Sequence, residues 1–589
     1  MLIHKRKMAV GFAVAVAAAS LMLPLLTMGA SAATRHASSK LSLTSLPRNQ
    51  TVYTSGVAYG APSAWNPMNV GAMATGTEGL VYETLELYNP VTNGYINWLA
   101  RSVTVSGLTC TIQLRNGIKW SNGKPLTSAD VAYTIMLAKT NLAVPYSNLG
   151  PYIKSVTTPT SSKVVVTFKS AAYTQWQNFL WHNPIINKAI WSAMTSANQV
   201  TGANTNPVGT GPMLFYAAND QEVAYNVNPN WWATKDLGLK FHFTYLVDVV
   251  NGSNNVELGQ LLAGNIDLSN NFLPGIASLI TSPASTGKLN SNGGYGLATY
   301  YPTAPFMMSA NTVWLEPNLT KAPMSNLNFR EALAYGINPG EIASVIYDNL
   351  VDPAGPIGLL PNLTPFINKT VLKKYGFSYN PAKAKAFLAA SERQAGGYKK
   401  GESITIQDPD GWTDWNSATD VIVQELKAVG INAVAYFPQD PTRNSNLTDG
   451  TYQLALDNNA GPSSNPWSYF DRVFQLPILK QQTAQLNWER DSNPAAWKLV
   501  GEIGGIAPSN KVAIQKIYTQ LETIFLQTLP EIPLWYNGAW AQYQTTYWKH
   551  FPSSTVKTDQ YTPVMWGGWL GNMTTVLGLA QLRPVPGAS

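Results

Sequence analysis

Charged residues are scarce in this chain of 589 residues. Asp, Glu, Lys and Arg make up 12% of it, about half of the roughly 25% that is usual in soluble proteins. The formal net charge of +7 comes from basic residues that do not cluster, so a nucleic-acid-binding protein is not indicated. Because few carboxylates are present, few native ion pairs would be lost in acid, which favours the hypothesis of an acidic external habitat.

Cysteine and histidine are nearly absent as well. The single cysteine, Cys110, excludes an intrachain disulfide. The five histidines show no metal-ligand spacing, and the chain lacks a nucleophile elbow, a P-loop and a CxxC pair. We therefore predict no catalytic residue, no metal site and no cofactor, and a protein that is not an enzyme. A glycoside-active enzyme stays an open alternative, because any two carboxylates could meet in the fold.

The N-terminus has the pattern of a secretory signal peptide, predicted over residues 1–32. A basic stretch at 4–7 precedes the apolar segment 8–28, and Ala30-Ser31-Ala32 fits a cleavage site. A transmembrane anchor is the alternative, but Pro24 and the cleavage site favour removal. No cysteine lies near this site, so a lipobox is absent. We expect a secreted, extracytoplasmic chain that is associated with the cell surface by other means, with a flexible lead over residues 33–46.

Two motifs are informative. In Leu114–Tyr133, two turns lead to Thr127, which is spaced from Asp130 as in a capping box at a helix start. Asn206–Met213 (NPVGTGPM) holds two glycines and two prolines, which specify a tight loop before a strand. A phosphate cradle is the alternative for this loop, but no Lys-Ser/Thr follows it.

These motifs resemble the hallmark segments of the family 5 extracellular solute-binding proteins, the peptide/oligosaccharide/nickel group of ABC importers. Asn228–Trp232, Leu261–Asp267 and Asn326–Glu341 resemble further segments of that family. The resemblance covers roughly residues 51–570 in the family's order. It implies a mixed α/β, two-lobed periplasmic-binding-protein clamshell with an extra subdomain in the N-terminal lobe. It also implies an ABC permease as partner, a small-molecule solute and a monomer.

The domain limits follow from this resemblance and from the local patterns. Residues 47–300 plus 531–589 are predicted to form lobe I, with the added subdomain at about 76–200. Residues 301–530 are predicted to form lobe II, where strand, helix and strand alternate over 403–436 as in an α/β unit. The chain would cross between the lobes near residues 300 and 530.

Aromatic residues are abundant, with 19 Trp and 28 Tyr. Several lie in polar loops or at the second crossing, where flat rings with polar tips suit a ligand. The alternative is that these rings fill seams between lobes. The predicted binding residues of this kind are Trp412, Trp415, Trp467, Trp535 and Tyr536.

The type of ligand is inferred from a comparison within the family. Oligopeptide binders place an arginine and then an aspartate, which anchors the peptide ammonium group, after a Gly-Thr-Tyr-like entry. Here the two positions are Leu456 and Pro462. Asp457 could substitute for the aspartate, but strand alternation would turn it to the other face.

Asn458 and Asn459 instead provide paired donors and acceptors, which suit neutral hydroxyls. We therefore predict a solute-binding subunit for an extended, uncharged ligand, with an oligosaccharide favoured. Oligopeptide or dipeptide binding, the default in this family, is the alternative.

Overall fold

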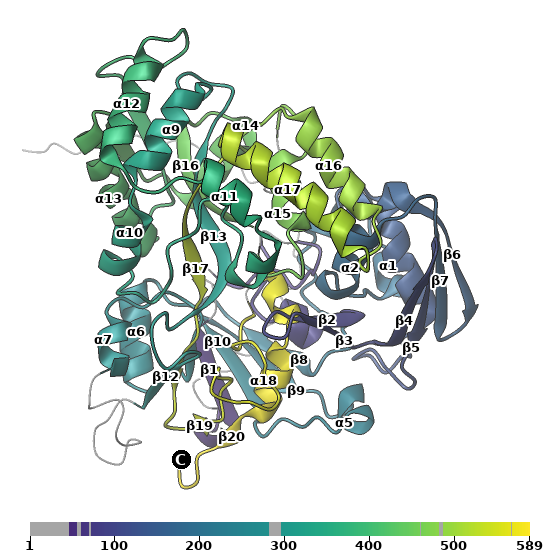
Figure 1. Cartoon of the computed structure of the whole chain (residues 1–589). Helices are drawn as coiled ribbons and strands as arrows, with labels where there is room; N and C mark the ends of the chain where they lie inside the picture. The colour runs from purple at the N-terminus through teal and green to yellow at the C-terminus, as the bar shows by residue number, and fades with distance from the viewer. Residues whose placement is uncertain are drawn as a thin grey trace, which may run out of the picture. The chain divides into compact units, whose positions relative to one another are not determined.

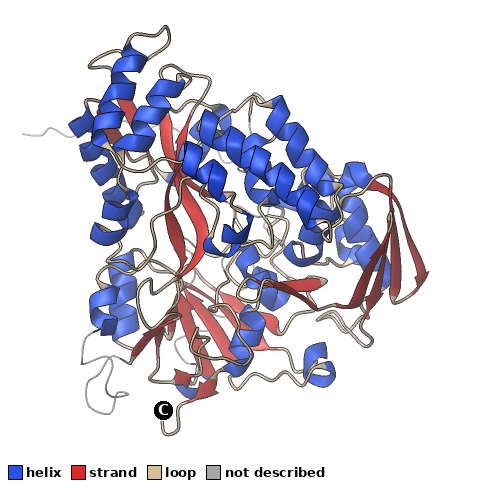
Figure 2. Cartoon of the chain, in the orientation of Figure 1, coloured by secondary structure: helices blue, strands red, loops and turns tan. Residues whose placement is uncertain are grey.

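The computed structural model describes residues 46–55, 61–69, 72–281, 296–459, 461–481, 487–566 and 568–588. The predicted signal peptide and nearly all of the predicted lead lie outside these residues. Helices surround several sheets (Figures 1 and 2), which confirms the predicted mixed α/β class. No helix in the described ranges has the length and apolarity that a membrane crossing requires.

The largest sheet is mixed and has seven strands in the order β12-β18-β11-β1-β10-β9-β8. β1 runs parallel to β10 and β11, and the other neighbouring pairs are antiparallel. The strands are β1 (Thr51–Ser55), β8 (Met213–Ala218), β9 (Glu222–Val227), β10 (Tyr245–Val249), β11 (Leu268–Ser269), β12 (Leu297–Thr299) and β18 (Gln542–Gln544).

The Gly-Thr-Gly-Pro loop before β8 packs directly on another backbone segment. A Cβ atom on Gly209 would lie 1.8 Å from the carbonyl oxygen of Val81, and one on Gly211 would lie 2.1 Å from that of Leu80. The amide of Gly211 also donates to the Val81 oxygen at 3.0 Å. The motif is a loop that leads into β8, as predicted, and it also makes a close backbone contact that needs glycine.

The Leu114–Tyr133 motif belongs to a four-stranded sheet of order β4-β5-β7-β6. Its strands are β4 (Ala100–Ser106), β5 (Thr109–Leu114), β6 (Ile153–Thr160) and β7 (Lys163–Phe168). Helix α1 (Ser128–Thr140) follows the predicted capping box, in which the amide of Thr127 donates to Asp130 Oδ2 at 2.9 Å. Cys110 is buried in β5, where the Trp176 indole donates to its sulfur at 3.1 Å.

A second large sheet has five strands in the order β15-β14-β16-β13-β17. They are β13 (Met308–Pro317), β14 (Ser403–Gln407), β15 (Asn432–Tyr436), β16 (Leu454–Asn459) and β17 (Ile532–Ala539). The helices on one side are α9 (Leu327–Gly336), α10 (Pro339–Val345), α12 (Pro381–Glu392) and α13 (Thr413–Val429). The helices on the other are α11 (Lys369–Tyr375), α15 (Trp467–Phe474), α16 (Pro494–Gly504) and α17 (Lys511–Thr528).

Successive residues of β13 alternate between these two helical layers. Val313 and Leu315 join the hydrophobic cluster of α9 and α13, whereas Trp314 joins the cluster of α15, α16 and α17. β16 pairs with β13 so that Asn458 lies opposite Val313 and Asp457 lies opposite Trp314. Because directly paired residues share a face, Asn458 and Asp457 are on opposite sides of the sheet.

The chain passes between the two large sheets twice. The first passage lies between β12 and β13, at residues 300–307, close to the predicted crossing near 300. The second lies between β17 and β18, at residues 540–541 rather than near 530, because β17 pairs with β13. The division into two lobes stays a prediction. β17, which was predicted to belong to lobe I, pairs with β13 in the five-stranded sheet.

Several tryptophans have a structural role around one buried carboxylate. The indole N–H groups of Trp98, Trp231 and Trp232 donate to Glu83 at 2.9, 3.0 and 2.9 Å. Burial raises the pKa of Glu83 to about 7. Some of the many tryptophans therefore have a structural role in the interior.

The remaining elements are short or connect the sheets. The strands are β2 (Glu86–Asn89), β3 (Gly94–Asn97), β19 (Trp548–Lys549) and β20 (Arg583–Pro584). The helices are α2 (Tyr173–His182), α3 (Lys188–Trp191), α4 (Ser196–Thr201), α5 (Trp232–Asp236), α6 (Asn254–Leu262), α7 (Ile276–Thr281), α14 (Asp440–Asp449) and α18 (Thr575–Gln581). The short turns of helix are η2 (Arg48–Gln50), η3 (Thr77–Val81), η4 (Ser147–Tyr152), η5 (Pro361–Phe366) and η6 (Gly568–Asn572).

Candidate functional site

A cavity of about 180 Å³ lies where the two large sheets meet, and we call it the central cavity. Its wall combines residues that follow β11 with the ends of β13, β16 and β17 and the start of α13. The lining residues are Asn254, Asn270, Asn271, Phe272, Ala310, Asn311, Trp412, Asp414, Trp415, Asn458, Asn537, Gly538, Ala539, Trp540, Met565 and Leu570.

Three of the predicted binding residues line this cavity. Trp412 and Trp415 come from the start of α13, with ring centroids 4.9 Å apart in an edge-on arrangement. Asn458 lines it from β16. Asn459 ends that strand, and its side chain lies outside the described residues.

The other three predicted residues do not line the central cavity. Trp467 is buried at the start of α15, and its indole donates to the Val500 carbonyl at 3.2 Å. Trp535 is fully buried in the core between α13 and β13. The Tyr536 hydroxyl donates to the Leu359 carbonyl at 2.9 Å. Trp467 and Trp535 are thus buried in the interior, and Tyr536 is half-buried.

The sequence interpretation missed most of the amides in the wall. Asn311 of β13 and Asn537 of β17 are cross-strand partners, and the side-chain oxygen of each is buried without a hydrogen-bond partner among the described residues. Asn270 follows β11, and its side-chain N–H groups donate to the carbonyls of Trp540 and Val564 at 2.8 and 2.9 Å. The available signal was the Asn270-Asn271 doublet, which follows shortly after Leu261–Asp267, a segment that resembles one of the family.

Hydrogen bonds fix other parts of the wall. The amide group of Asn254 in α6 donates to the hydroxyl of Thr413 at 3.1 Å, which joins α6 to the start of α13. Glu257 accepts a hydrogen bond from the Asn271 amide at 2.7 Å. Burial raises the pKa of Glu257 to about 7. These hydrogen bonds thus connect α6 to the start of α13 and to the segment that follows β11, two parts of the cavity wall.

Asp414 is the only ionisable residue among the described residues that line the central cavity. It accepts a hydrogen bond from the Tyr347 hydroxyl at 3.1 Å. Burial raises its pKa to about 6, although this hydrogen bond and the amides at the helix start oppose the rise. Among its described residues, the cavity wall therefore carries one weak acid and no cationic side chain.

Asp457 is unavailable to a ligand in this cavity. It lies on the far side of β16, where its carboxylate forms ion pairs with Arg443 at 2.9 Å and with Arg472 at 3.0 Å. The prediction from strand alternation is confirmed. The idea that Asp457 substitutes for the missing ammonium anchor is corrected, because two buried guanidinium groups already compensate its charge.

Comparison with known proteins identifies the family. The model described as "Bacterial extracellular solute-binding proteins, family 5 Middle" matches residues 94–477, more than half of the chain. The chain belongs to this family. Its members are extracytoplasmic substrate-binding subunits of ABC importers rather than enzymes.

The alignments with similar proteins cover most of this chain. A nickel-binding periplasmic protein of Escherichia coli is 24% identical over 505 residues, which cover 80% of this chain and 88% of the relative. A dipeptide-binding protein of Escherichia coli is 23% identical and covers 73% and 80%. The crystal structure of a periplasmic oligopeptide-binding protein from Thermotoga maritima, with mannohexaose bound, is 33% identical. It covers 92% of this chain and 99% of its own, with a TM-score of 0.83.

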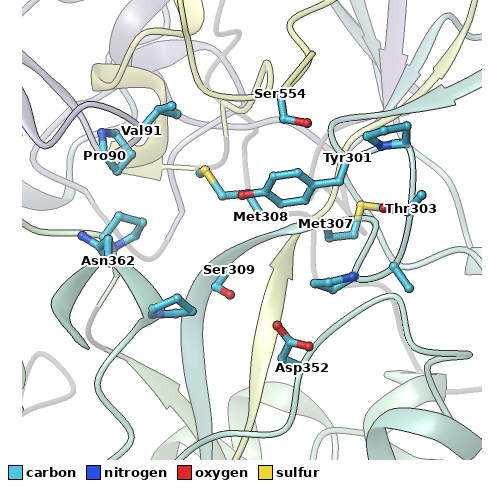
Figure 3. A pocket seen from close by; sticks show the side chains of 15 residues that line it. Pro90, Val91, Tyr301, Thr303, Met307, Met308, Ser309, Asp352, Asn362 and Ser554 are labelled. Atoms are coloured by element: carbon cyan, nitrogen blue, oxygen red, sulfur yellow. The ribbon is translucent and has the colours of Figure 1, made fainter. Parts of the chain in front are cut away.

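A second cavity of the family 5 protein is larger, at about 480 Å³. Figure 3 shows Tyr301 projecting into it near Met307 and Met308, with Ser309 and Asp352 on another side. The lining residues are Pro90, Val91, Tyr301, Pro302, Thr303, Ala304, Pro305, Met307, Met308, Ser309, Asp352, Pro361, Asn362, Pro462 and Ser554. Among them is Pro462, the position that we predicted from the family comparison to correspond to the anchoring aspartate of peptide binders.

Proposed function

We propose that the protein captures a neutral, extended oligosaccharide in the central cavity and delivers it to an ABC permease. The observation that carries this proposal is the composition of the wall, which holds six asparagines and three tryptophans and has one ionisable side chain among its described residues. Amides donate and accept hydrogen bonds without charge, as hydroxyls require. Indole rings give apolar area for sugar faces at a low entropic cost.

The Thermotoga maritima protein that was crystallised with mannohexaose supports this choice of ligand, since it is 33% identical over nearly the whole of both chains. A manno-oligosaccharide is therefore the first ligand to test. The proposed binding residues are Trp412, Trp415 and Asn458, joined by Asn311, Asn537 and Trp540.

The second candidate is an oligopeptide, and Asp414 favours it. This carboxylate lies in the cavity wall, and with a pKa of about 6 it is mostly ionised at pH 7. It could pair with a peptide ammonium group, whose burial without a carboxylate would be costly. Against this candidate, Asp414 already accepts a hydrogen bond from Tyr347.

The variant Asp414→Asn separates the two candidates. If Asp414 anchors an ammonium group, this variant loses peptide binding by at least about 3 kcal/mol, the cost of leaving a buried charge unpaired. If the ligand is a sugar, Asn still accepts hydrogen bonds and the affinity changes little. Asp420→Asn, an exposed position of the same helix, is the control. Peptide binding that depends on Asp414 would overturn the oligosaccharide proposal.

We also propose that the two lobes close around the ligand and that the protein acts as a monomer. It would be secreted through the signal peptide and associated with the cell surface without an N-terminal lipid. Small-angle scattering should show a smaller radius of gyration with mannohexaose than without it. An unchanged radius at saturating sugar would contradict closure, and mass photometry of the same sample tests the monomer.

A further inference from the structure

We infer that the second cavity is an additional binding compartment, which holds sugar rings that extend beyond the central cavity. This inference rests on the proposed oligosaccharide function. The central cavity alone, at about 180 Å³, is smaller than the ~300–1,000 Å³ of typical ligand sites. An extended oligosaccharide therefore needs space elsewhere.

The two cavities adjoin along one strand. Met308 and Ser309 of β13 line the second cavity, whereas the next two residues, Ala310 and Asn311, line the central cavity. One hydrophobic cluster supplies a wall to both. Its members Met308 and Tyr301 face the second cavity, while Ala310, Ala539, Met565 and Leu570 face the central one.

The second cavity suits neutral sugar rings for the same reason as the central cavity. Asp352 is the only carboxylate among its described lining residues, which include no Lys, Arg or His, and it is exposed. Ser309, Thr303 and Ser554 offer hydroxyls. Asn362, whose side-chain N–H group donates to the Ser463 carbonyl at 2.9 Å, offers its side-chain oxygen. An oligosaccharide chain can exchange hydrogen bonds with all of these groups without burying a charge.

Five prolines and a short closed loop restrict the local backbone of the segments that line this compartment. Prolines at 90, 302, 305, 361 and 462 line it, and their fixed φ limits movement of the wall. The loop from Tyr301 to Phe306 is closed by a hydrogen bond from the Tyr301 amide to the Phe306 carbonyl at 3.1 Å. Segments that are ordered before binding lower the entropic cost of binding, and the proposed closure of the lobes would bring them together around the ligand.

Tyr301 is the side chain that we assign to ring stacking in this compartment. Its half-buried ring projects into the cavity (Figure 3). Tyr300 supports it, with ring centroids 4.9 Å apart in an edge-on arrangement. A tyrosine held in this way presents a fixed face to a sugar ring.

The test is calorimetry of β-linked manno-oligosaccharides of two and six sugars with the full mature chain. We expect Tyr301→Ala to weaken mannohexaose about three- to tenfold, the range for an aromatic contact, and to leave mannobiose unchanged. Ser554→Trp, which obstructs the cavity from a position whose side chain is half-buried, should weaken mannohexaose alone. Tyr216→Ala is the matched control, because Tyr216 also belongs to an edge-on tyrosine pair but lies on β8.

The outcomes separate this inference from the proposed function. Equal affinity for two and six sugars, unaffected by Tyr301→Ala and Ser554→Trp, would overturn the second compartment and leave the oligosaccharide function intact. Absence of binding to every sugar of the series would overturn both. Circular dichroism of each variant checks that a loss of binding does not come from unfolding.

Discussion

Replacing Glu531 by Gln should flatten the pH dependence of the protein's stability. Glu531 directly precedes β17 and is fully buried, and neither of its carboxylate oxygens has a hydrogen-bond partner among the described residues. One of them lies within 4.8 Å of carboxylate oxygens of Glu316 and Glu489. Burial, followed by the neighbouring Glu489, raises the pKa of Glu531 well above its usual range.

The surrounding charges do not compensate this carboxylate. Arg472 forms ion pairs with Glu316 at 3.0 Å, with Asp457 at 3.0 Å and with Glu489 at 3.5 Å. Arg443 pairs with Asp457. Acidic groups thus outnumber guanidinium groups in this described cluster. We expect the folded protein to keep a proton on Glu531 at a pH where the unfolded chain has lost it.

The direction of the effect follows from proton linkage. Above the unfolded pKa of about 4.3 and below the raised folded pKa, the folded state binds one more proton than the unfolded state at this site. The free energy of unfolding therefore falls as the pH rises, by about 1.4 kcal/mol per pH unit for one group. Gln cannot ionise, so the variant should have a slope shallower by this amount and should exceed the parent in stability at pH 8.

The assay is urea unfolding followed by tryptophan fluorescence at several pH values between 5 and 8. Glu392→Gln, an exposed position of α12, is the control and should leave the slope unchanged. Parallel stability–pH lines for the parent and Glu531→Gln would show that Glu531 does not hold a proton in the folded protein over this pH range. A purified protein whose stability rises from pH 5 to pH 8 would also count against the hypothesis of an acidic habitat.

The remaining predictions concern single side chains. Trp412→Ala should weaken mannohexaose by about 1–3 kcal/mol in calorimetry, whereas Trp497→Ala, a half-buried tryptophan of α16, should not. Trp467→Ala should lower the free energy of unfolding by about 3–5 kcal/mol in urea titrations and leave the affinity nearly unchanged. Gly209→Ala should lower the melting temperature sharply, because its Cβ would lie 1.8 Å from a carbonyl oxygen. Gly252→Ala, with open space at its Cβ, is its control, and equal melting temperatures would contradict this account.

Local features of the fold could be predicted from the sequence where neighbouring residues determine them. The capping box of Thr127 and Asp130 acts within one helical turn, and it formed as predicted. Strand alternation placed Asp457 and Asn458 on opposite faces. The glycines at 209 and 211 predicted a tight loop before a strand, which formed, but the sequence did not show the close contact with the backbone of Leu80 and Val81.

The binding residues were harder to predict because distant segments form the wall. Asn270 and Asn537 are separated by more than 260 residues, and both line the central cavity. Trp467 and Trp535 stand in segments that look like polar loops or crossings, but the packing of α15 and β17 buries them. The kind of residue alone does not tell whether a ring faces a ligand or the core.

Isothermal titration calorimetry of the mature protein at pH 7 would decide whether the central cavity takes a neutral sugar or a peptide. Mannohexaose would be titrated in one series, and tetraalanine with a free or an acetylated N-terminus in the other. We expect saturable heat with the sugar and none with either peptide, because the described cavity wall is amide-rich and holds only Asp414 as an acid. Tight binding of the free peptide, lost on acetylation and without heat from the sugar, would contradict it.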